Sequence, residues 1–301
     1  MQKPKRLRDG AHIRVVAPAS ICNQAAVERT AAWLQQRGYR VSMGSHVYDV
    51  DRIFAGRDVD RAQDIVDAVN DPSVDAIFAA RGGYGSARVL PYLARYDWRD
   101  IKPKIFLGYS DMTALHSFWQ TVCGWVTFHG PMMESDWTGI NGETALAVLR
   151  GDMTALGPVP LEPLLPSVLE LPQACWQGGN LAVLTSLIGT PYFPSLQGSV
   201  CYLEEVQEAP YRVDRMLQQL YQSGSLEGAV GLVFGEATRC DSQDERGYQV
   251  REVVQDFALQ HQIPAWWGFW AGHGPTNLTV PLGIELRHEG SSMVFEEAAV
   301  Q

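Results

Sequence analysis

The chain has few cysteines, and they lack the spacing that metal sites and disulfide frameworks need. Its 301 residues hold five of them, with no CxxC pair and no cysteine and histidine at zinc spacing. None stands on a recognisable sharp turn, which disfavours a catalytic thiolate. We therefore expect buried, free thiols at all of these positions, which are Cys22, Cys123, Cys175, Cys201 and Cys240.

Positive charge and long apolar runs are also scarce. The chain has 24 Lys and Arg against 34 Asp and Glu, whereas nucleic acids and anionic membranes bind clustered basic residues. No apolar run reaches the roughly 18 residues that span a bilayer, and the first residues lack the apolar core of a signal peptide. These absences predict a cytoplasmic protein that binds neither nucleic acid nor membrane.

Strand and helix patterns alternate along the first half of the chain. Short apolar runs are followed by helical patterns that end at glycine, proline or turn residues. Such alternation indicates βαβ crossovers and a mainly parallel sheet, and so an α/β fold. The expected strands are 13–17, 75–80, 104–107 and 125–128, and the expected helices are 25–36, 58–69, 86–94 and 112–122.

A proline-rich segment divides the chain. Residues 157–172 contain five prolines and no helical period, which is typical of a semi-rigid linker. A chain of this length also exceeds the usual size of a single core. We predict one domain at 1–156 and a second at 173–301. In the second domain the expected strands are 199–203, 230–234, 265–269, 278–280 and 293–296, and the expected helices are 211–222 and 251–261.

Ser110 is the first candidate for chemistry. It stands where an apolar strand pattern gives way to a helical one, which is the context of a nucleophile elbow. Gly108 supplies the small residue two positions earlier, but Met112 occupies the place of the second glycine of a GxSxG motif. A serine that caps the following helix would give the same local pattern.

A nucleophilic serine needs a base, and the base needs an orienting acid. We favour His273 as the base, because its flanking glycines let the loop approach a ligand closely. His116 and His129 are alternatives that would also fit as hydrogen-bonded core residues. The remaining histidines lie in polar or surface-like contexts, and they are His12, His46, His261 and His288.

Two adjacent acids, Glu204 and Glu205, end the expected strand 199–203. Because side chains alternate across a strand, we expect one acid to face the interior and the other to face water. A buried acid is costly without a partner, and a histidine is such a partner. Glu204 could equally be a solvated residue at a strand edge.

Glycines follow the expected strand 75–80 in the sequence Arg81-Gly82-Gly83-Tyr84-Gly85. Glycines there let backbone amides form a nest for a carboxylate, a phosphate or an oxyanion, although a tight strand-to-helix turn explains them as well. A phosphate is the less attractive ligand, because neither GxGxxG nor GxxxxGK[ST] is present.

Together these segments resemble the LD-carboxypeptidase family of serine peptidases, which includes muramoyl-tetrapeptide carboxypeptidases and microcin C self-immunity peptidases. The resemblance covers nearly the whole chain, and the shared order of its motifs makes it specific. The motifs are VAPAS at 16–20, FAG at 54–56, ARGGYG at 80–85, GYSD at 108–111, HGPM at 129–132, GGNL at 178–181, IGTP at 188–191, LEE at 203–205, PYRVDRML at 210–217 and GHG at 272–274.

The resemblance implies a flavodoxin-like N-terminal domain and a smaller, β-rich α+β C-terminal domain, with a catalytic triad at their interface. The residues that match the family's triad are Ser110 as nucleophile, Glu204 as acid and His273 as base. The amides of Gly83 and Asp111 would form the oxyanion hole, with Gly82 as an alternative to Gly83. Acyl transfer of this kind requires no metal and no organic cofactor.

The family's substrate is a cell-wall muropeptide, cut between the L-centre of a dibasic residue and a terminal D-alanine during peptidoglycan recycling. Arginine suits the free carboxylate of such a substrate by its bidentate geometry. The candidates are Arg81, Arg212 and Arg215, although the last two could instead form surface ion pairs with Glu208 or Asp214. Tyr84 and Trp176 could line the pocket or pack in the core.

Two other functions stay open at this point. A microcin-type immunity peptidase would keep the fold and cleave an acyl-sulfamoyl or phosphoramidate aminoacyl nucleotide. A catalytically inactive ligand-binding relative would lack the serine and histidine pair, and the sequence shows no such loss. The family also implies a homodimer.

Overall fold

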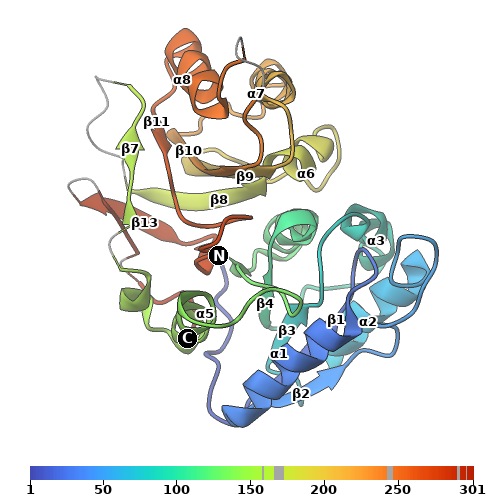
Figure 1. Ribbon diagram of the computed structural model, residues 1–301. Coiled ribbons are helices and arrows are strands. Elements are labelled where there is room, and N and C mark those ends of the chain that lie inside the picture. The colour runs from blue at the N-terminus through green and yellow to red at the C-terminus, as the bar shows by residue number, and fades with distance from the viewer. Residues whose placement is uncertain (158, 166–172, 243–246, 290–291, 296) are drawn as a thin grey trace.

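Two β-sheets, stacked one above the other in Figure 1, form the frame of the molecule. The computed structural model describes residues 1–157, 159–165, 173–242, 247–289, 292–295 and 297–301. Half of the expected linker 157–172 (residues 158 and 166–172) and the end of the expected strand 293–296 lie outside the described residues. The domain boundaries at 156 and 173 therefore stay predictions.

The first sheet confirms the expected flavodoxin-like arrangement. Its strands are β1 (His12–Val16), β2 (Arg40–Met43), β3 (Ala76–Ala79), β4 (Ile105–Gly108), β5 (Thr127–His129) and β12 (Val280–Leu282). They lie in the order β12-β5-β4-β3-β1-β2, in which β1 to β5 are parallel and follow the flavodoxin order 2-1-3-4-5. β12 adds an antiparallel edge next to β5.

Helices cover both faces of this sheet, because its strands are apolar on both sides. Val15 packs with Leu34 on one face, and Ile77 packs with Ile65 on the other. The first face carries α1 (Gln24–Gln36) and α5 (Ile140–Arg150). The second face carries α2 (Asp58–Asn70), α3 (Ser86–Leu93) and α4 (Thr113–Phe118), which continues into the π-helical turn η2 (Trp119–Cys123).

The second sheet has parallel strands at its centre and short antiparallel strands at its edges. The central strands are β8 (Ala174–Asn180), β9 (Ser199–Val206), β10 (Gly231–Thr238) and β11 (Ala265–Trp267). The edge strands are β6 (Val159–Pro160), β7 (Glu162–Pro163), β13 (Glu285–Glu289) and β14 (Ser292–Val294). Its outer face packs on α6 (Leu181–Ser186), α7 (Pro210–Gln222) and α8 (Val250–His261).

The inner face of the second sheet packs directly on the first half of the chain. Tyr202 and Val233 belong to the same apolar cluster as Val15 and Phe128 of the first sheet. Leu203, one residue after Tyr202 on β9, belongs instead to the cluster under α7. Since side chains alternate along β9, Glu204 faces the first sheet, and a reactive site can be assembled between the two sheets.

Several elements were not predicted, and each lacks a strong periodic pattern. β8 is interrupted by two glycines, α5 begins after Gly139 and contains Gly142, and β2 follows α1 after only a short turn. The expected strand 278–280 begins at Val280 and joins the first sheet rather than the second. Register within a sheet depends on neighbours distant in sequence, which local patterns do not specify.

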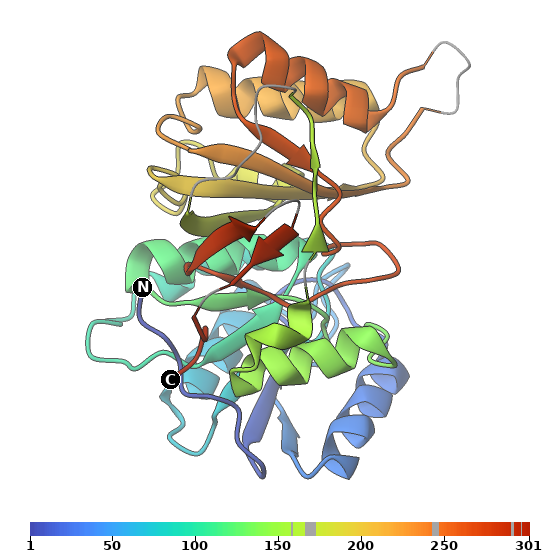
Figure 2. The ribbon, with the colours of Figure 1, turned by 90° about the vertical axis from the view of Figure 1, so that its left-hand side faces the viewer.

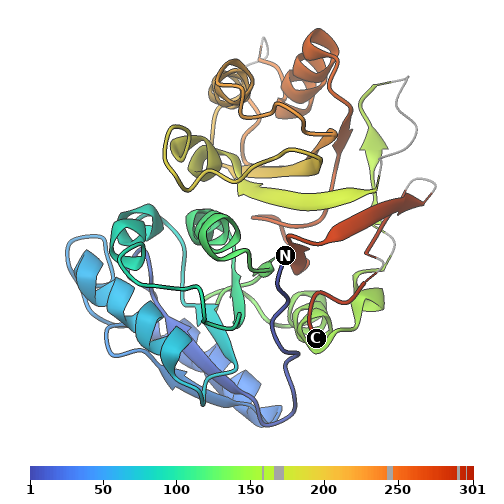
Figure 3. The same ribbon diagram turned by 180° about the vertical axis from the view of Figure 1, so that it is seen from behind.

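The two ends of the chain lie side by side, as Figures 2 and 3 show. Arg6 N–H donates to Gln301 O at 3.0 Å, and Gln301 N–H donates to Pro4 O at 2.9 Å. All five cysteines are free, and Cys201 and Cys240 are buried as expected whereas the other three are half-buried. In the part of the chain that the structure describes, no helix is both long and apolar enough to cross a bilayer.

Candidate active site

Ser110 lies at a sharp turn between a strand and a helix. It follows β4 and begins the 3₁₀ turn η1 (Ser110–Met112), with φ +62°, in the left-handed region that non-glycine residues rarely adopt. A Cβ atom at Gly108 would lie 2.6 Å from Met112 Cγ, so the glycine makes room for the buried methionine. In a GxSxG motif a second glycine would stand at position 112. Here Gly108 leaves room for the Met112 side chain, which accounts for the departure from that motif.

His273 connects Ser110 to Glu204. Its Nε2 atom lies 3.0 Å from Ser110 Oγ, and its Nδ1 atom lies 2.7 Å from Glu204 Oε2. At Gly272 the φ of +124° and the Glu204 carboxylate, 2.7 Å from the position of a Cβ, both require glycine. The three groups come from the turn after β4, from β9 and from the loop before β12, so the structure brings together the three residues that the family resemblance selected.

Both acids of the expected pair are buried, which corrects the prediction that one would meet water. Glu204 is 0% exposed and Glu205 is 2% exposed. β9 lies inside a sheet covered on both faces, so alternation sends one acid to the interface and the other toward α6. There Glu205 accepts hydrogen bonds from Asn180 Nδ2 at 3.0 Å and from Ala182 N–H at 2.8 Å.

The two alternative bases are core residues. His116 donates from Nε2 to Gly108 O at 2.8 Å, and burial lowers its pKa to about 4. Burial also holds the pKa of His129 well below its ordinary value, so both imidazoles are neutral near pH 7. Neither is hydrogen-bonded to Ser110 Oγ. His116 instead supports the turn, because it holds the carbonyl of the residue two before the serine.

A further acid, Glu236 on β10, was missed at the sequence level. It accepts a hydrogen bond from Gly274 N–H, and burial, with a contribution from Glu204, raises its pKa to about 7. Burial lowers the pKa of His273, but the carboxylates of Glu204, Glu205 and Glu236 outweigh it and leave that pKa above its ordinary value. The sequence did contain a signal for Glu236, because this acid stands just past the expected strand 230–234, as Glu204 stands just past the expected strand 199–203.

The glycine loop that follows β3 lies against the serine. A Cβ atom at Gly82 would lie 3.2 Å from Ser110 Oγ and 3.4 Å from Asp111 N. Ser20 holds the next part of the loop, because its Oγ accepts from Tyr84 N–H at 3.1 Å and its N–H donates to Gly82 O at 3.2 Å. The amides expected at an oxyanion hole therefore belong to two segments in close contact.

Asp111 ties the serine turn to the start of α3. Its carboxylate accepts from Ser86 N–H at 2.7 Å, and Ser86 Oγ donates in return to Asp111 O. Burial raises the pKa of Asp111 to about 6, against the lowering effect of the hydrogen bonds from Ser86. Protonation of Asp111 in mild acid would weaken this connection between the glycine loop and the serine.

The expected substrate-binding side chains lie in different environments. Arg81 Nη1 donates to Ile21 O at 2.8 Å, and Tyr84 is exposed at the edge of the glycine loop. Trp176 is 0% exposed and stacks on Tyr202 at 5.0 Å, so it packs in the core and does not line a pocket. Arg212 Nη1 lies 3.2 Å from Glu208 Oε2, which is the surface ion pair that the sequence left open.

A parallel sheet that carries a serine on a strand-to-helix turn, next to an imidazole and a carboxylate, is the arrangement of a serine hydrolase. Comparison with known proteins identifies the family. The LD-carboxypeptidase N-terminal domain model matches residues 13–130, and the C-terminal domain model matches residues 174–287. The chain belongs to the LD-carboxypeptidase family, as the sequence motifs indicated, and is a hydrolase of the serine carboxypeptidase type.

Individual relatives agree with this assignment. A probable murein peptide carboxypeptidase of Bacillus subtilis is 32% identical over 94% of this chain and 90% of its own. The solved muramoyltetrapeptide carboxypeptidase of Oxalobacter formigenes is 27% identical over 94% of this chain and 97% of its own, with a TM-score of 0.78. A solved microcin C7 self-immunity protein has a TM-score of 0.86 over 100% of both chains at 22% identity, which shows the fold alone.

The raised pKa of His273 gives a testable pH dependence. A general base acts in its neutral form, so kcat/KM is expected to fall as the pH drops through the His273 pKa. Glu236→Gln keeps an acceptor for Gly274 N–H but removes a charge that raises this pKa. The acid limb of the profile should therefore move to lower pH, by less than about one unit because Glu236 is itself partly protonated there.

The measurement is kcat/KM from pH 5 to 9 for the parent, Glu236→Gln and a control, Glu227→Gln. Glu227 is exposed in the turn after α7, and its replacement should leave the profile unchanged. An acid limb that stays in place, or moves to higher pH, in Glu236→Gln would show that this carboxylate does not act on His273.

Proposed function

We propose that the protein is an LD-carboxypeptidase that releases the terminal D-alanine from muropeptide tetrapeptides, at the bond that follows an L-diamino acid. The observation that carries the proposal is the hydrogen-bonded series of Ser110, His273 and Glu204. The name of the Oxalobacter formigenes relative, a muramoyltetrapeptide carboxypeptidase, supports the substrate class.

The proposed reaction is acyl transfer through an ester on Ser110. His273 Nε2 takes the hydroxyl proton while Ser110 Oγ attacks the scissile carbonyl carbon. Collapse of the tetrahedral intermediate breaks the C–N bond, and His273 gives the proton to the nitrogen of the departing D-alanine. Water then attacks the ester with His273 as base, and the proton returns to Ser110 Oγ.

Glu204 has an orienting role in this mechanism. Its Oε2 atom accepts from His273 Nδ1–H, which leaves Nε2 unprotonated and directed at the serine. Its full burial strengthens the interaction with the imidazolium that forms during each proton transfer.

Backbone amides complete the proposed site. We assign the oxyanion hole to the N–H groups of Gly83 and Asp111, with Gly82 as the alternative on the glycine loop. Each such donor typically lowers the barrier by about 3 kcal/mol. Arg81 and Tyr84, at the two ends of that loop, are proposed to contact the peptide stem of the substrate. We further propose that the enzyme works in the cytoplasm as a homodimer.

Hydrolysis of defined substrates tests the function. We expect stoichiometric release of D-alanine from an N-acetylmuramoyl tetrapeptide, measured by chromatography of the products. An aminoacyl-sulfamoyl adenosine, the substrate type of an immunity peptidase, serves as the competing substrate. Preferential cleavage of the nucleotide would replace the proposal with the immunity function, and cleavage of neither would favour an inactive ligand-binding relative.

A further inference from the structure

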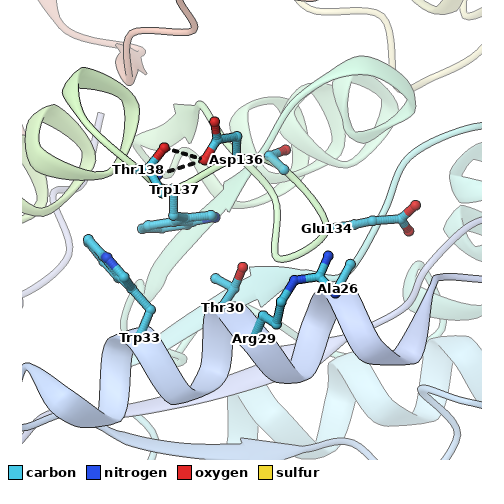
Figure 4. Close-up of a pocket in the computed structure, with 9 residues that line it drawn as sticks. Ala26, Arg29, Thr30, Trp33, Glu134, Asp136, Trp137 and Thr138 are labelled. Carbon is cyan, nitrogen blue, oxygen red and sulfur yellow. Dashed lines mark hydrogen bonds between the residues drawn. The ribbon is translucent and has the colours of Figure 1, made fainter.

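A hollow of about 350 Å³ opens between α1 and the loop 134–138, outside the residues assigned to catalysis (Figure 4). α1 contributes Arg29 and Trp33 to its wall, and the loop contributes Glu134, Asp136 and Trp137. Aromatic surface, both signs of charge and hydroxyl groups therefore meet in one place. Nothing in the proposed mechanism uses this hollow.

The two tryptophan rings are held rigidly. Their centroids lie 5.7 Å apart with the planes inclined by 57°, so the rings form a corner and not a parallel slot. The Arg37 guanidinium covers Trp33 at 3.5 Å, and Phe78 stacks on Trp137 at 5.7 Å. Trp137 Nε1–H also donates to Met132 O at 2.7 Å. Trp137 is only 3% exposed, so a ligand would contact mainly Trp33, whose ring is already in place. Such preorganisation reduces the entropic cost of binding.

The hollow presents two carboxylates as acceptors, beside the Arg29 guanidinium as a donor. Asp136 is oriented by hydrogen bonds from Thr138 N–H at 2.8 Å and Thr138 Oγ1 at 2.7 Å, and these bonds lower its pKa. Glu134, which also lines the hollow, accepts from Asn23 N–H through Oε2 at 3.0 Å. Ionised carboxylates accept hydrogen bonds only, so they suit a ligand that is rich in hydroxyl and amide donors.

Two residues that line the hollow contact neighbours of the proposed catalytic serine. Glu134 Oε2 lies 4.0 Å from Arg81 Nε, and Arg81 immediately precedes Gly82, which lies against Ser110. Ser135, which lines the hollow, is hydrogen-bonded to Tyr109, the residue before the serine. Three residues of extended peptide span about 10 Å, which is the reach available to a substrate between its scissile bond and the group that precedes those residues.

We propose that the hollow binds the amino sugar at the N-terminal end of the muropeptide stem. This inference rests on the proposed function, in which a tetrapeptide places three residues between the sugar and the scissile bond. On the other side of that bond stands a single D-alanine, which is too small to fill a space of this size. A sugar ring presents C–H groups to the Trp33 ring and hydroxyl and amide donors to the two carboxylates.

A nucleobase is the competing occupant, and the geometry disfavours it. A base binds best between or against parallel aromatic faces. Here the rings are inclined, and Arg37 and Phe78 already occupy one face of each. An adenine also offers few donors for two carboxylates.

The test compares an N-acetylmuramoyl tetrapeptide with the same tetrapeptide without the sugar. For Trp33→Ala we expect KM for the sugar-bearing substrate to rise about tenfold, with kcat unchanged and the sugar-free substrate unaffected. Asp136→Asn, which keeps an acceptor for Thr138, should raise the same KM by a smaller factor. Tyr96→Ala, a partly exposed aromatic after α3, is the control. Equal effects of Trp33→Ala on both substrates, or on neither, would overturn the inference.

Binding to the Ser110→Ala protein separates this inference from the proposed function. We expect calorimetry to give a lower Kd for the sugar-bearing peptide than for the free one, and Trp33→Ala in this background to remove the difference. The result does not depend on hydrolysis, so failure of the parent to release D-alanine would reject the function alone. If instead Trp33→Ala weakens only an aminoacyl-sulfamoyl adenosine, the hollow binds a base and the sugar assignment is wrong.

Discussion

Replacement of Ser110 by alanine is expected to lower kcat for D-alanine release by a factor on the order of 10⁴ to 10⁶. The substitution removes the only atom that becomes covalently bound to the substrate in the proposed reaction. A water molecule that attacked in its place would not be held at the scissile carbonyl as Ser110 Oγ is. Alanine keeps the Cβ atom and fits the same turn, so the backbone at φ +62° is retained. KM, or the Kd for uncleaved substrate, should therefore change little.

The control for this prediction is Ser223→Ala. Ser223 is exposed at the end of α7, where its Oγ donates to Leu220 O, and it lies on the outer face of the second sheet. Its replacement should leave kcat within a factor of two or so of the parent, since surface substitutions of this kind are usually mild. Release of D-alanine by Ser110→Ala at a rate comparable to the parent would remove Ser110 from the mechanism.

Four strands of the first sheet, β1, β3, β4 and β5, were predictable because their signals are local. Each apolar run was bounded by turn residues and followed by a helical period, and right-handed crossovers then leave few arrangements for parallel strands. The position of Ser110 followed from the same pattern, since a strand that ends before a helix defines the turn. The hydrogen bond between His273 and Ser110 could not be predicted from local patterns, because it depends on contact between segments 163 residues apart.

The errors share a cause, which is burial decided by distant parts of the chain. Glu205 and Trp176 lie on central strands of the second sheet, and that sheet is covered on both faces. Alternation along a strand shows which side chains share a face but not whether the other face meets water or another layer. Glu236 was missed for the same reason, because only the packing of β10 beside β9 brings it near His273.

The buried pair on β9 allows a prediction with an internal control. Glu204→Gln is expected to lower kcat about 10⁴-fold, the size of effect typical for removal of the triad charge with the geometry intact. A glutamine amide can donate to His273 Nδ1, which would place the ring proton on Nε2 and direct it at Ser110 Oγ. The imidazole could then no longer accept the serine proton, and the imidazolium would lose its buried counter-charge.

Glu205→Gln makes the same chemical change one residue along the strand. Its carboxylate faces α6, and burial raises its pKa to about 7, so the charge removed there is only partial at neutral pH. We expect kcat to stay within about tenfold of the parent, because His273 keeps its hydrogen bond to Glu204. Steady-state kinetics on the two variants therefore distinguish a catalytic carboxylate from a buried one. Equal losses would mean that burial of charge at this strand end matters and the contact with His273 does not.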